Sequence, residues 1–152
     1  MTGPVAVRLA ADADREPWGE LFRGYRDFYG KAHDPAVIDT VWGWITDPAH
    51  STRCLIAETD GRAIGFGHFR AFGRPIDGGH GLYLDDLFTA PGERGTGAAS
   101  AILQFLAQVA HREGASVVRW ITAEGNETAR RLYERLATQT PWVTYDMAPR
   151  LR

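Results

Sequence analysis

A run of small residues around two glycines is the part of the sequence best suited to hold an anion. The run begins at an arginine and reads Arg94-Gly95-Thr96-Gly97-Ala98-Ala99. Small residues let a backbone bend sharply and let another molecule approach it closely. If a helix begins here, its first N–H groups have no intrahelical partner and lie at the positive end of the helix dipole. We therefore predict a phosphate-binding turn, to which Arg94 adds a full positive charge.

Three other kinds of turn have a similar composition. A Walker P-loop ends in Gly-Lys-Ser/Thr, and this run contains no lysine. A dinucleotide-binding fingerprint needs Gly or Ala where this chain has Ser100, and an acidic residue about 20 positions later, where the chain reads Arg119-Trp120-Ile121-Thr122. The third kind is a strand–helix turn whose glycines serve packing alone. The dinucleotide and packing interpretations stay open at this point.

Two adjacent carboxylates, Asp85 and Asp86, precede this turn on a segment whose other residues are apolar. The segment Leu82–Thr89 is expected to be a strand. Successive side chains of a strand point to opposite faces, so we expect only one of the two carboxylates in a given cleft. A half-buried carboxylate there could take a proton from a substrate, directly or through water, or bind a cationic substrate. The alternative is a structural salt bridge to one of the many arginines.

Two motifs in this order resemble the GNAT superfamily of N-acetyltransferases. The glycine turn fits the family pattern Gln/Arg-x-x-Gly-x-Gly/Ala, whose backbone amides hold the pyrophosphate of acetyl-CoA. Downstream, Asn126 and Tyr133 have the spacing of an asparagine after the fifth strand of the family and a tyrosine seven residues later. Two motifs in the right order are more specific than either alone, and the resemblance covers the chain from Val5 to about Met147.

The resemblance implies acetyl-CoA as the cosubstrate and assigns roles to the residues that match the family motifs. Tyr133 corresponds to the acid that protonates the departing CoA thiolate. The backbone of the fourth strand supplies the N–H donor for the thioester carbonyl. The cofactor-binding residues that it implies are Leu87, Phe88, Thr89, Arg94, Gly95, Thr96, Gly97, Ala98, Ala99 and Asn126.

The acidic strand also resembles one subgroup of that family. The run from Tyr83 to Phe88 looks like the Leu-Glu-Asp-Phe/Leu-Phe segment of polyamine and histone-type acetyltransferases. By this match Asp85 occupies the proton-relay or substrate-amine position and Asp86 lies beside it. The two N-terminal helices wall the acceptor pocket in the family, so the resemblance offers three aromatic residues for substrate contact: Tyr25, Tyr29 and Trp44.

The activity so implied is direct attack of a primary amine on acetyl-CoA in a ternary complex. The expected acceptor is a small molecule, namely a polyamine, a diamine or an amino-acid-like amine. A protein lysine or N-terminus is an alternative acceptor, and a non-catalytic module that senses CoA or another nucleotide is an alternative of another class. Polyamine-type relatives are often homodimers, so a homodimer is expected here too.

Composition places these motifs in an ordinary globular protein. The chain has 152 residues, 44% of them hydrophobic and 24% charged, so we expect one domain spanning residues 1–152. A net charge of −2 gives no general attraction to nucleic acid. No signal peptide or membrane-spanning run is recognisable. Cys54 is the sole cysteine, so a reducing cytoplasm is expected, and the five histidines lack metal-ligand spacing, so no metal is expected.

Hydrophobic periodicity predicts six strands in a mixed α/β sheet with helices on both faces, and the GNAT resemblance implies a sheet of about six to seven strands. Thr59-Asp60-Gly61 predicts a tight hairpin turn, because Asp-Gly tolerates positive φ. The Gly- and Pro-rich segment Arg70–His80 is expected to be an exposed, mobile loop. The expected strands are Val5–Leu9, Arg53–Glu58, Arg62–Phe69, Leu82–Thr89, Val117–Ile121 and Trp142–Met147, with helices after Asp14, after Asp34, over Gly97–Glu113 and after Asn126.

Overall fold

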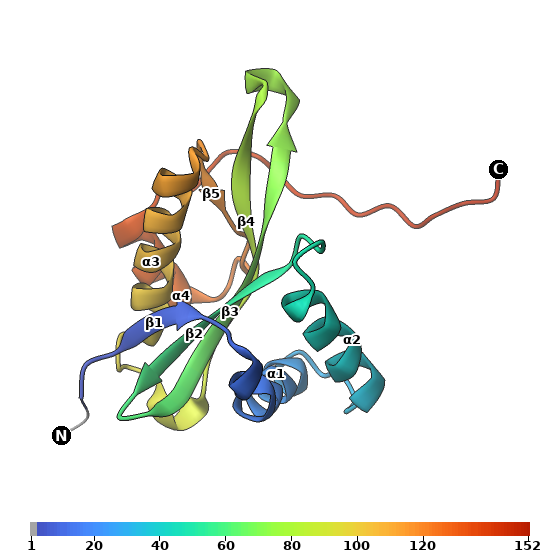
Figure 1. Ribbon diagram of the computed structural model, residues 1–152. Coiled ribbons are helices and arrows are strands. Elements are labelled where there is room, and N and C mark those ends of the chain that lie inside the picture. The colour runs from blue at the N-terminus through green and yellow to red at the C-terminus, as the bar shows by residue number, and fades with distance from the viewer. Residues whose placement is uncertain (1–2) are drawn as a thin grey trace. The chain divides into compact units, whose positions relative to one another are not determined.

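The computed structural model describes residues 3–152 as two compact units. The first unit ends at Ile121 and contains a sheet with helices on both of its faces (Figure 1). The second, Thr122–Arg152, contains one helix, α4. The mixed α/β class predicted from periodicity is confirmed, and a single domain over the whole length stays a prediction.

The sheet of the first unit runs in the order β1-β2-β3-β4-β5. The first four strands pair antiparallel with their neighbours, and β5 pairs parallel with β4. A chain that returns parallel needs a crossover, and the helix α3 supplies it. The strands are β1 (Ala6–Leu9), β2 (Arg53–Thr59), β3 (Arg62–Arg74), β4 (Gly79–Thr89) and β5 (Val118–Arg119).

Three helices cover the sheet, and each begins where its sequence predicts. Helices α1 (Arg15–Phe28) and α2 (Pro35–Thr46) lie over one face and α3 (Ala98–Glu113) over the other (Figure 1). The Asp34 carboxylate caps α2 by accepting a hydrogen bond from the Ala36 amide at 3.0 Å. Glycines in the left-handed region bound α3 at both ends, Gly97 with φ 88° and Gly114 with φ 71°.

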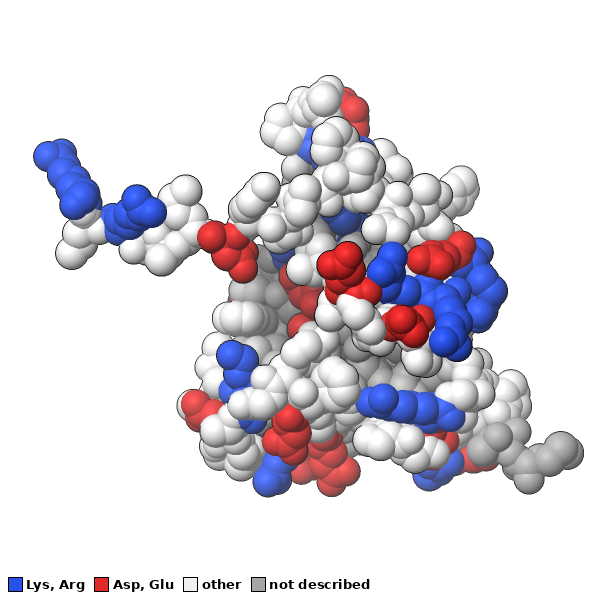
Figure 2. Space-filling view, turned by 180° about the vertical axis from the view of Figure 1, so that it is seen from behind, with Lys and Arg blue, Asp and Glu red and all other residues white. Residues whose placement is uncertain are grey.

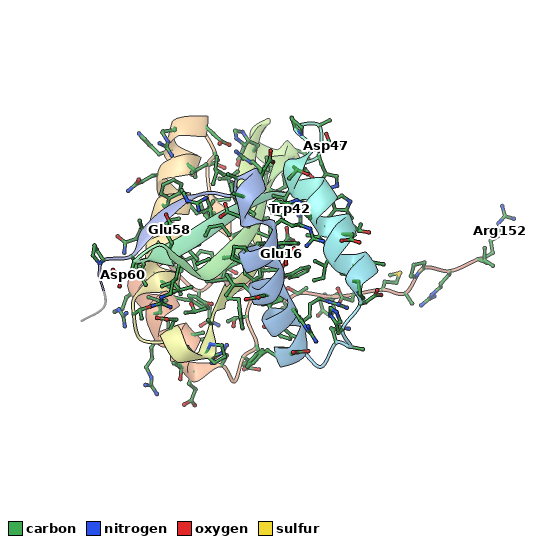
Figure 3. The ribbon with its side chains drawn as sticks, turned by 60° about the horizontal axis from the view of Figure 1, so that its bottom comes forward. Glu16, Trp42, Asp47, Glu58, Asp60 and Arg152 are labelled. Carbon is green, nitrogen blue, oxygen red and sulfur yellow. The ribbon has the colours of Figure 1, made fainter. Side chains whose placement is uncertain are left out.

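The core beneath α1 and α2 is built mainly from aromatic rings. Trp18 is completely buried, and its ring centroid lies 5.3 Å from that of Phe22 and 5.1 Å from that of Trp42 on α2, which Figure 3 labels. Cys54 is buried in the same cluster, and burial raises the pKa of its thiol. A thiol held protonated in an apolar cluster serves packing and is no nucleophile.

Two glycines of β3 let neighbouring elements approach closely. A Cβ on Gly67 would lie 3.1 Å from Ile102 of α3 and 3.2 Å from Leu84 of β4. A Cβ on Gly65 would lie only 2.7 Å from the backbone oxygen of Phe88, a contact that backbone atoms cannot relieve by a rotamer change. The absence of side chains at these positions therefore sets the spacing between β3, β4 and α3.

The expected loop at Arg70–His80 is wrong, because β3 and β4 continue through most of it as a long hairpin (Figure 1). Only Pro75–Asp77 forms a turn, which ends at Gly78 with φ 62°. Cross-strand contacts explain the difference: the Arg70 guanidinium lies 4.8 Å from the Tyr83 ring centroid, and the ring of Phe72 packs against that of Tyr83. Such pairs stabilise a sheet despite unfavourable Gly and Pro propensity.

The predicted closing strand Trp142–Met147 is also wrong, and the described residues form five strands rather than six to seven. The fifth strand is shorter than predicted, with only Val118 and Arg119 paired. Alternation alone does not make a strand, because a strand also needs a hydrogen-bonding partner and a face to bury. The large apolar residues of the closing segment are all at least 75% exposed: Trp142, Val143, Tyr145 and Met147.

In the second unit, α4 (Glu127–Leu136) begins at the predicted Asn126, whose side chain accepts a hydrogen bond from the Ala129 amide at 3.4 Å. Arg130 donates to the carbonyl of Glu124 at 2.7 Å and so ties the helix to the preceding turn. Within residues 3–152, no helix has the length and apolarity required to cross a membrane. Figure 2 shows acidic and basic side chains interspersed on the face that it views.

The glycine at position 65 provides a test of the sheet. We expect Gly65→Ala to lower the free energy of unfolding by about 1–3 kcal/mol, because the new methyl group overlaps the Phe88 carbonyl. The control is Gly43→Ala, on the exposed surface of α2 with no atom near the new methyl; it should raise stability by about 0.5–1 kcal/mol. Urea denaturation measures both, and an unchanged Gly65→Ala midpoint would contradict the packing described.

Candidate active site

The glycine turn has the geometry of an anion cradle. Gly95 (φ 83°) and Gly97 (φ 88°) both adopt left-handed conformations, and no heavy atom lies within 4 Å of where a Cβ would stand on either. Gly97 has no side chain with which to cap α3, so the first amides of that helix receive no side-chain acceptor. Thr96 turns its hydroxyl inward and donates it to the Glu93 carbonyl at 2.7 Å. An anion placed at this turn would meet unpaired N–H groups at the positive end of a 16-residue helix.

The predicted basic residue of the turn, Arg94, contacts the end of α1. Its guanidinium carbon lies 5.7 Å from the ring centroid of Phe28. Arg62 of β3 anchors the turn through a 2.6 Å ion pair with Glu93. The last turn of α1 therefore adjoins the anion cradle.

Most of the β4 edge that faces β5 is not paired with β5. β5 pairs with Leu82 and Tyr83 only, and no other described strand pairs with this edge. The Ala90 amide donates to the Ile64 carbonyl on β3, so strand alternation turns the amides of Leu87 and Thr89 away from β3. These amides can bind an extended ligand as a neighbouring strand would.

A β-bulge brings both acidic residues to the same face of the sheet. His68 pairs with Asp86 and Phe69 with Leu84, so Asp85 is the extra residue of β4. His68 and Arg70 project from one face of β3, and they bond to Asp86 and Asp85 respectively. The expectation that the carboxylates point to opposite faces is therefore wrong, because an inserted residue interrupts the alternation.

A buried chain of hydrogen bonds holds Asp86. The indole N–H of Trp18 donates to Nε2 of His68 at 3.0 Å, and Nδ1 of His68 lies 2.8 Å from a carboxylate oxygen of Asp86. Because Nε2 accepts a hydrogen bond, the ring proton is on Nδ1, which donates to the carboxylate. This geometry assigns His68, a buried residue, to the neutral tautomer.

The charge state of Asp86 follows from its surroundings. Burial acts to raise its pKa, but its interactions with His68, followed by the hydrogen bond from the Tyr25 hydroxyl, outweigh burial and hold the pKa below its usual range. Asp86 is therefore ionised at neutral pH, and its side chain keeps 26% of its surface exposed. An ionised carboxylate that is fixed on one side and open on the other can bind an ammonium group.

One predicted substrate residue, Tyr25, lies beside this carboxylate, and a second, Tyr29, packs against Tyr25. Tyr25 hydrogen-bonds to both Asp86 and Tyr29, and burial, followed by the Asp86 charge, raises the pKa of its phenol. It therefore stays protonated and acts as a donor. Tyr29 is exposed, with its ring centroid 5.0 Å from that of Tyr25. Trp44 instead stacks on His50.

Phe88 points into the core beneath α1. The remaining predicted residues belong to the second unit. Asn126 caps α4, and the Tyr133 carbonyl accepts a hydrogen bond from the Ala137 amide at 2.8 Å. Among residues 3–152 no group of three or more His, Cys, Asp or Glu side chains is placed to hold a metal ion.

Sequence reasoning missed three residues that support the acidic pair, namely Trp18, His68 and Arg70. His68 and Asp86 are 18 residues apart, and no local motif connects them. The signal that could have brought His68 and Arg70 to the acidic strand is the long hairpin: Arg74 pairs with Gly79, which puts position 68 opposite position 85, and the bulge shifts that pairing to Asp86. Reading that segment as a loop hid the pairing.

Comparisons with known proteins identify the family. The model of the Acetyltransferase (GNAT) family matches residues 18–137, most of the chain. The chain belongs to the GNAT family of N-acetyltransferases. A GNAT relative described as D-amino-acid N-acetyltransferase HPA3, from Saccharomyces cerevisiae, is 27% identical over 143 residues, covering 93% of this chain and 89% of the relative. The uncharacterized N-acetyltransferase YhfO of Bacillus subtilis is 30% identical over 129 residues, covering 85% of this chain and 86% of the relative.

Solved GNAT structures share the fold. The aminoglycoside N-acetyltransferase AAC(6')-Iy, solved in complex with CoA, superposes with a TM-score of 0.79 at 18% identity, covering 97% of this chain and 96% of that one. The GNAT resemblance inferred from two short motifs is thus confirmed, and with it the expectation that the protein is an acetyltransferase enzyme.

The lowered pKa of Asp86 predicts a pH-dependent contribution to stability. A carboxyl group whose folded-state pKa lies below its unfolded value of about 3.9 stabilises the fold when ionised, and the contribution is lost as pH falls through the folded value. Asp86→Asn should therefore cost about 1–3 kcal/mol at pH 7. The difference in free energy of unfolding between the wild type and Asp86→Asn should narrow below about pH 4.

Urea denaturation of both proteins from pH 7 to pH 3 measures this difference. Asp77→Asn, in the exposed hairpin turn, is the control and should differ from the unchanged protein by a small amount that varies little with pH. A gap for Asp86→Asn that stays constant across the range would show that the carboxylate charge contributes nothing.

Proposed function

We propose that this GNAT enzyme transfers the acetyl group of acetyl-CoA to the primary amine of a small molecule. The observation that carries the proposal is an ionised, partly exposed carboxylate, Asp86, next to an open strand edge and an anion-binding helix start. These are the three groups that an acetyl-CoA-dependent N-acetyltransferase needs: one for the amine, one for the thioester and one for the pyrophosphate.

In this proposal the cosubstrate binds along the open edge of β4. The pyrophosphate accepts hydrogen bonds from the turn at Arg94–Ala99, where Gly95 and Gly97 leave room for it. The outward amides of Leu87 and Thr89 bind the extended arm of CoA and the thioester carbonyl, which gains negative charge during attack. Phe88 contributes through its packing, since its amide faces β3. Asn126 keeps its predicted cofactor role through the family motif.

The amine binds on the opposite side of the thioester carbon, at the acidic pair. Asp86 anchors the ammonium form, a solvent water accepts the ammonium proton, and the neutral amine then attacks. Both oxygens of Asp85 accept from Nε of Arg70, so Asp86 is the better placed carboxylate for the amine. Asp85, the residue that the sequence match favours, is the alternative proton acceptor, and comparing Asp85→Asn with Asp86→Asn separates the two roles.

The leaving thiolate needs a proton once the C–S bond breaks. Tyr133 is proposed to donate it, on the strength of its spacing from Asn126 in the family motif. The new C–N bond, the broken C–S bond and the protonated thiol complete the reaction. The expected homodimer stays a prediction.

The curated relative HPA3 favours a small-molecule acceptor, although the solved structures of the same fold include a ribosomal-protein-alanine N-acetyltransferase. HPA3 is described as acting on D-amino acids and AAC(6')-Iy as an aminoglycoside acetyltransferase, and both kinds of molecule carry amines. The direct test is a screen of polyamines, diamines, amino acids and lysine peptides for thiol release from acetyl-CoA. Turnover only with peptides would overturn the proposed acceptor, and no turnover with any amine would favour a CoA sensor.

A charge placed in the cradle should block the cosubstrate. We expect Gly97→Asp to weaken CoA binding at least 100-fold, because a carboxylate would occupy the space and repel the pyrophosphate. Gly114→Asp is the matched control: it sits at the other end of α3, in the same left-handed region with equally open space. Isothermal titration calorimetry should show CoA affinity retained in the control. Equal affinity in both variants would refute the cradle.

Removal of the proposed acid should slow chemistry without affecting cosubstrate binding. Tyr133→Phe is expected to lower kcat by about 100-fold or more at an unchanged Kd for CoA, since general acid catalysis contributes this order of rate enhancement. Stopped-flow thiol detection measures kcat, and calorimetry measures Kd. A variant with full kcat would remove Tyr133 from the mechanism while leaving the cradle and the acidic pair in place.

A further inference from the structure

Arg70 is a guanidinium held in a fixed orientation beside the acidic pair with its outer nitrogens unused. Its Nε donates to the two oxygens of Asp85 at 3.0 and 3.3 Å, and its guanidinium carbon lies 4.8 Å from the Tyr83 ring centroid. Within the first unit, residues 3–121, the hydrogen bonds of Arg70 to other side chains all come from Nε and leave Nη1 and Nη2 unused. The side chain is 39% exposed. An arginine bound through Nε and one ring face presents its remaining N–H fork ready for a bidentate anion.

Arg70 and Asp86 lie on the same face of the sheet, so one ligand could contact the N–H fork of Arg70 and the carboxylate of Asp86 together. Arg70 lies two residues beyond His68 on the same face of β3, and His68 holds Asp86. Two residues along a strand span about 6.8 Å, so an anion site and an ammonium site stand side by side on one face. An α-amino acid carries an ammonium and a carboxylate on one carbon, and its two charges match these two sites.

We propose that the acceptor is a free α-amino acid bound as its zwitterion, with the ammonium on Asp86 and the carboxylate on the Nη fork of Arg70. This rests on the proposed function and names the substrate class of the same site. Arg70 then determines specificity, and Asp85 and Tyr83 position it.

The charges on the sheet face that carries Arg70 and Asp86 favour an α-amino acid over a polyamine or a peptide. Asp85 and Arg70 form an ion pair and His68 is neutral, so one carboxylate, Asp86, is available for one ammonium. A polyamine would place its second ammonium against the Arg70 guanidinium and be repelled. A peptide N-terminus carries an amide where the amino acid has a carboxylate, so it would leave the fork unused.

The test compares amino acids with their amides, which keep the amine and lose the carboxylate. The probes are leucine and phenylalanine in both enantiomers, each with its amide, and spermidine. We expect the unchanged enzyme to prefer the acids. Arg70→Gln should lower kcat/KM for the acids about 10- to 100-fold, mainly through KM, and change it less than about threefold for the amides. Arg70→Lys keeps the charge without the fork, so its kcat/KM for the acids should lie between those of the wild type and Arg70→Gln.

Arg74→Gln is the matched control, because Arg74 lies on the same face of β3 four residues further along and pairs with Asp77. It should leave both substrate kinds unchanged. An equal loss for acid and amide in Arg70→Gln would mean a structural role, and a wild-type preference for spermidine or the amides would also overturn the inference; either result leaves the amine acetyltransferase intact. If none of the amines caused thiol release from acetyl-CoA, both this inference and the proposed function would be overturned.

Discussion

The pairing of β3 with β4, interrupted by one extra residue, is the constraint on which the rest of the first unit depends. The bulge at Asp85 shifts the alternation of β4, so that two adjacent carboxylates share the face beneath α1 while the amides of Leu87 and Thr89 turn to the open edge. A regular strand would have sent one of the acids into the apolar side packed by α3. One inserted residue thus places the groups for an amine and for a thioester next to each other.

Local patterns predicted the fold class, the helix starts and the glycine turn because each depends on neighbouring residues. Asp34 before Pro35 caps its own helix, and Gly97 and Gly114 bound α3 by their own backbone freedom. The errors arose where distant residues decide the outcome. Gly73 and Pro75 suggested a loop, but Phe72, Arg70 and Tyr83 pair across the hairpin and keep it in the sheet. The closing segment alternated like a strand and lacks a partner.

The residues of the candidate site also fall into two groups, those that a local pattern predicts and those that only tertiary packing brings together. Asp85, Asp86 and the cradle were recognisable in sequence because a family motif or helix physics marks each one. The support of Asp86 was not, since Trp18, His68 and Asp86 come from three elements separated by 50 and 18 residues. Their contact depends on the depth at which α1 packs over the sheet, and no single stretch of sequence encodes that depth.

The part of the β4 edge with which no described strand pairs has a consequence for the resting enzyme. A row of outward amides is a template onto which any extended chain can add, and such edges are the usual starting points of aggregation. The arm of the cosubstrate proposed to lie there would occupy the same donors. In that case acetyl-CoA would occupy the strand edge as a neighbouring strand does. The cellular concentration of acetyl-CoA would then limit self-association of the protein as well as supply its cosubstrate.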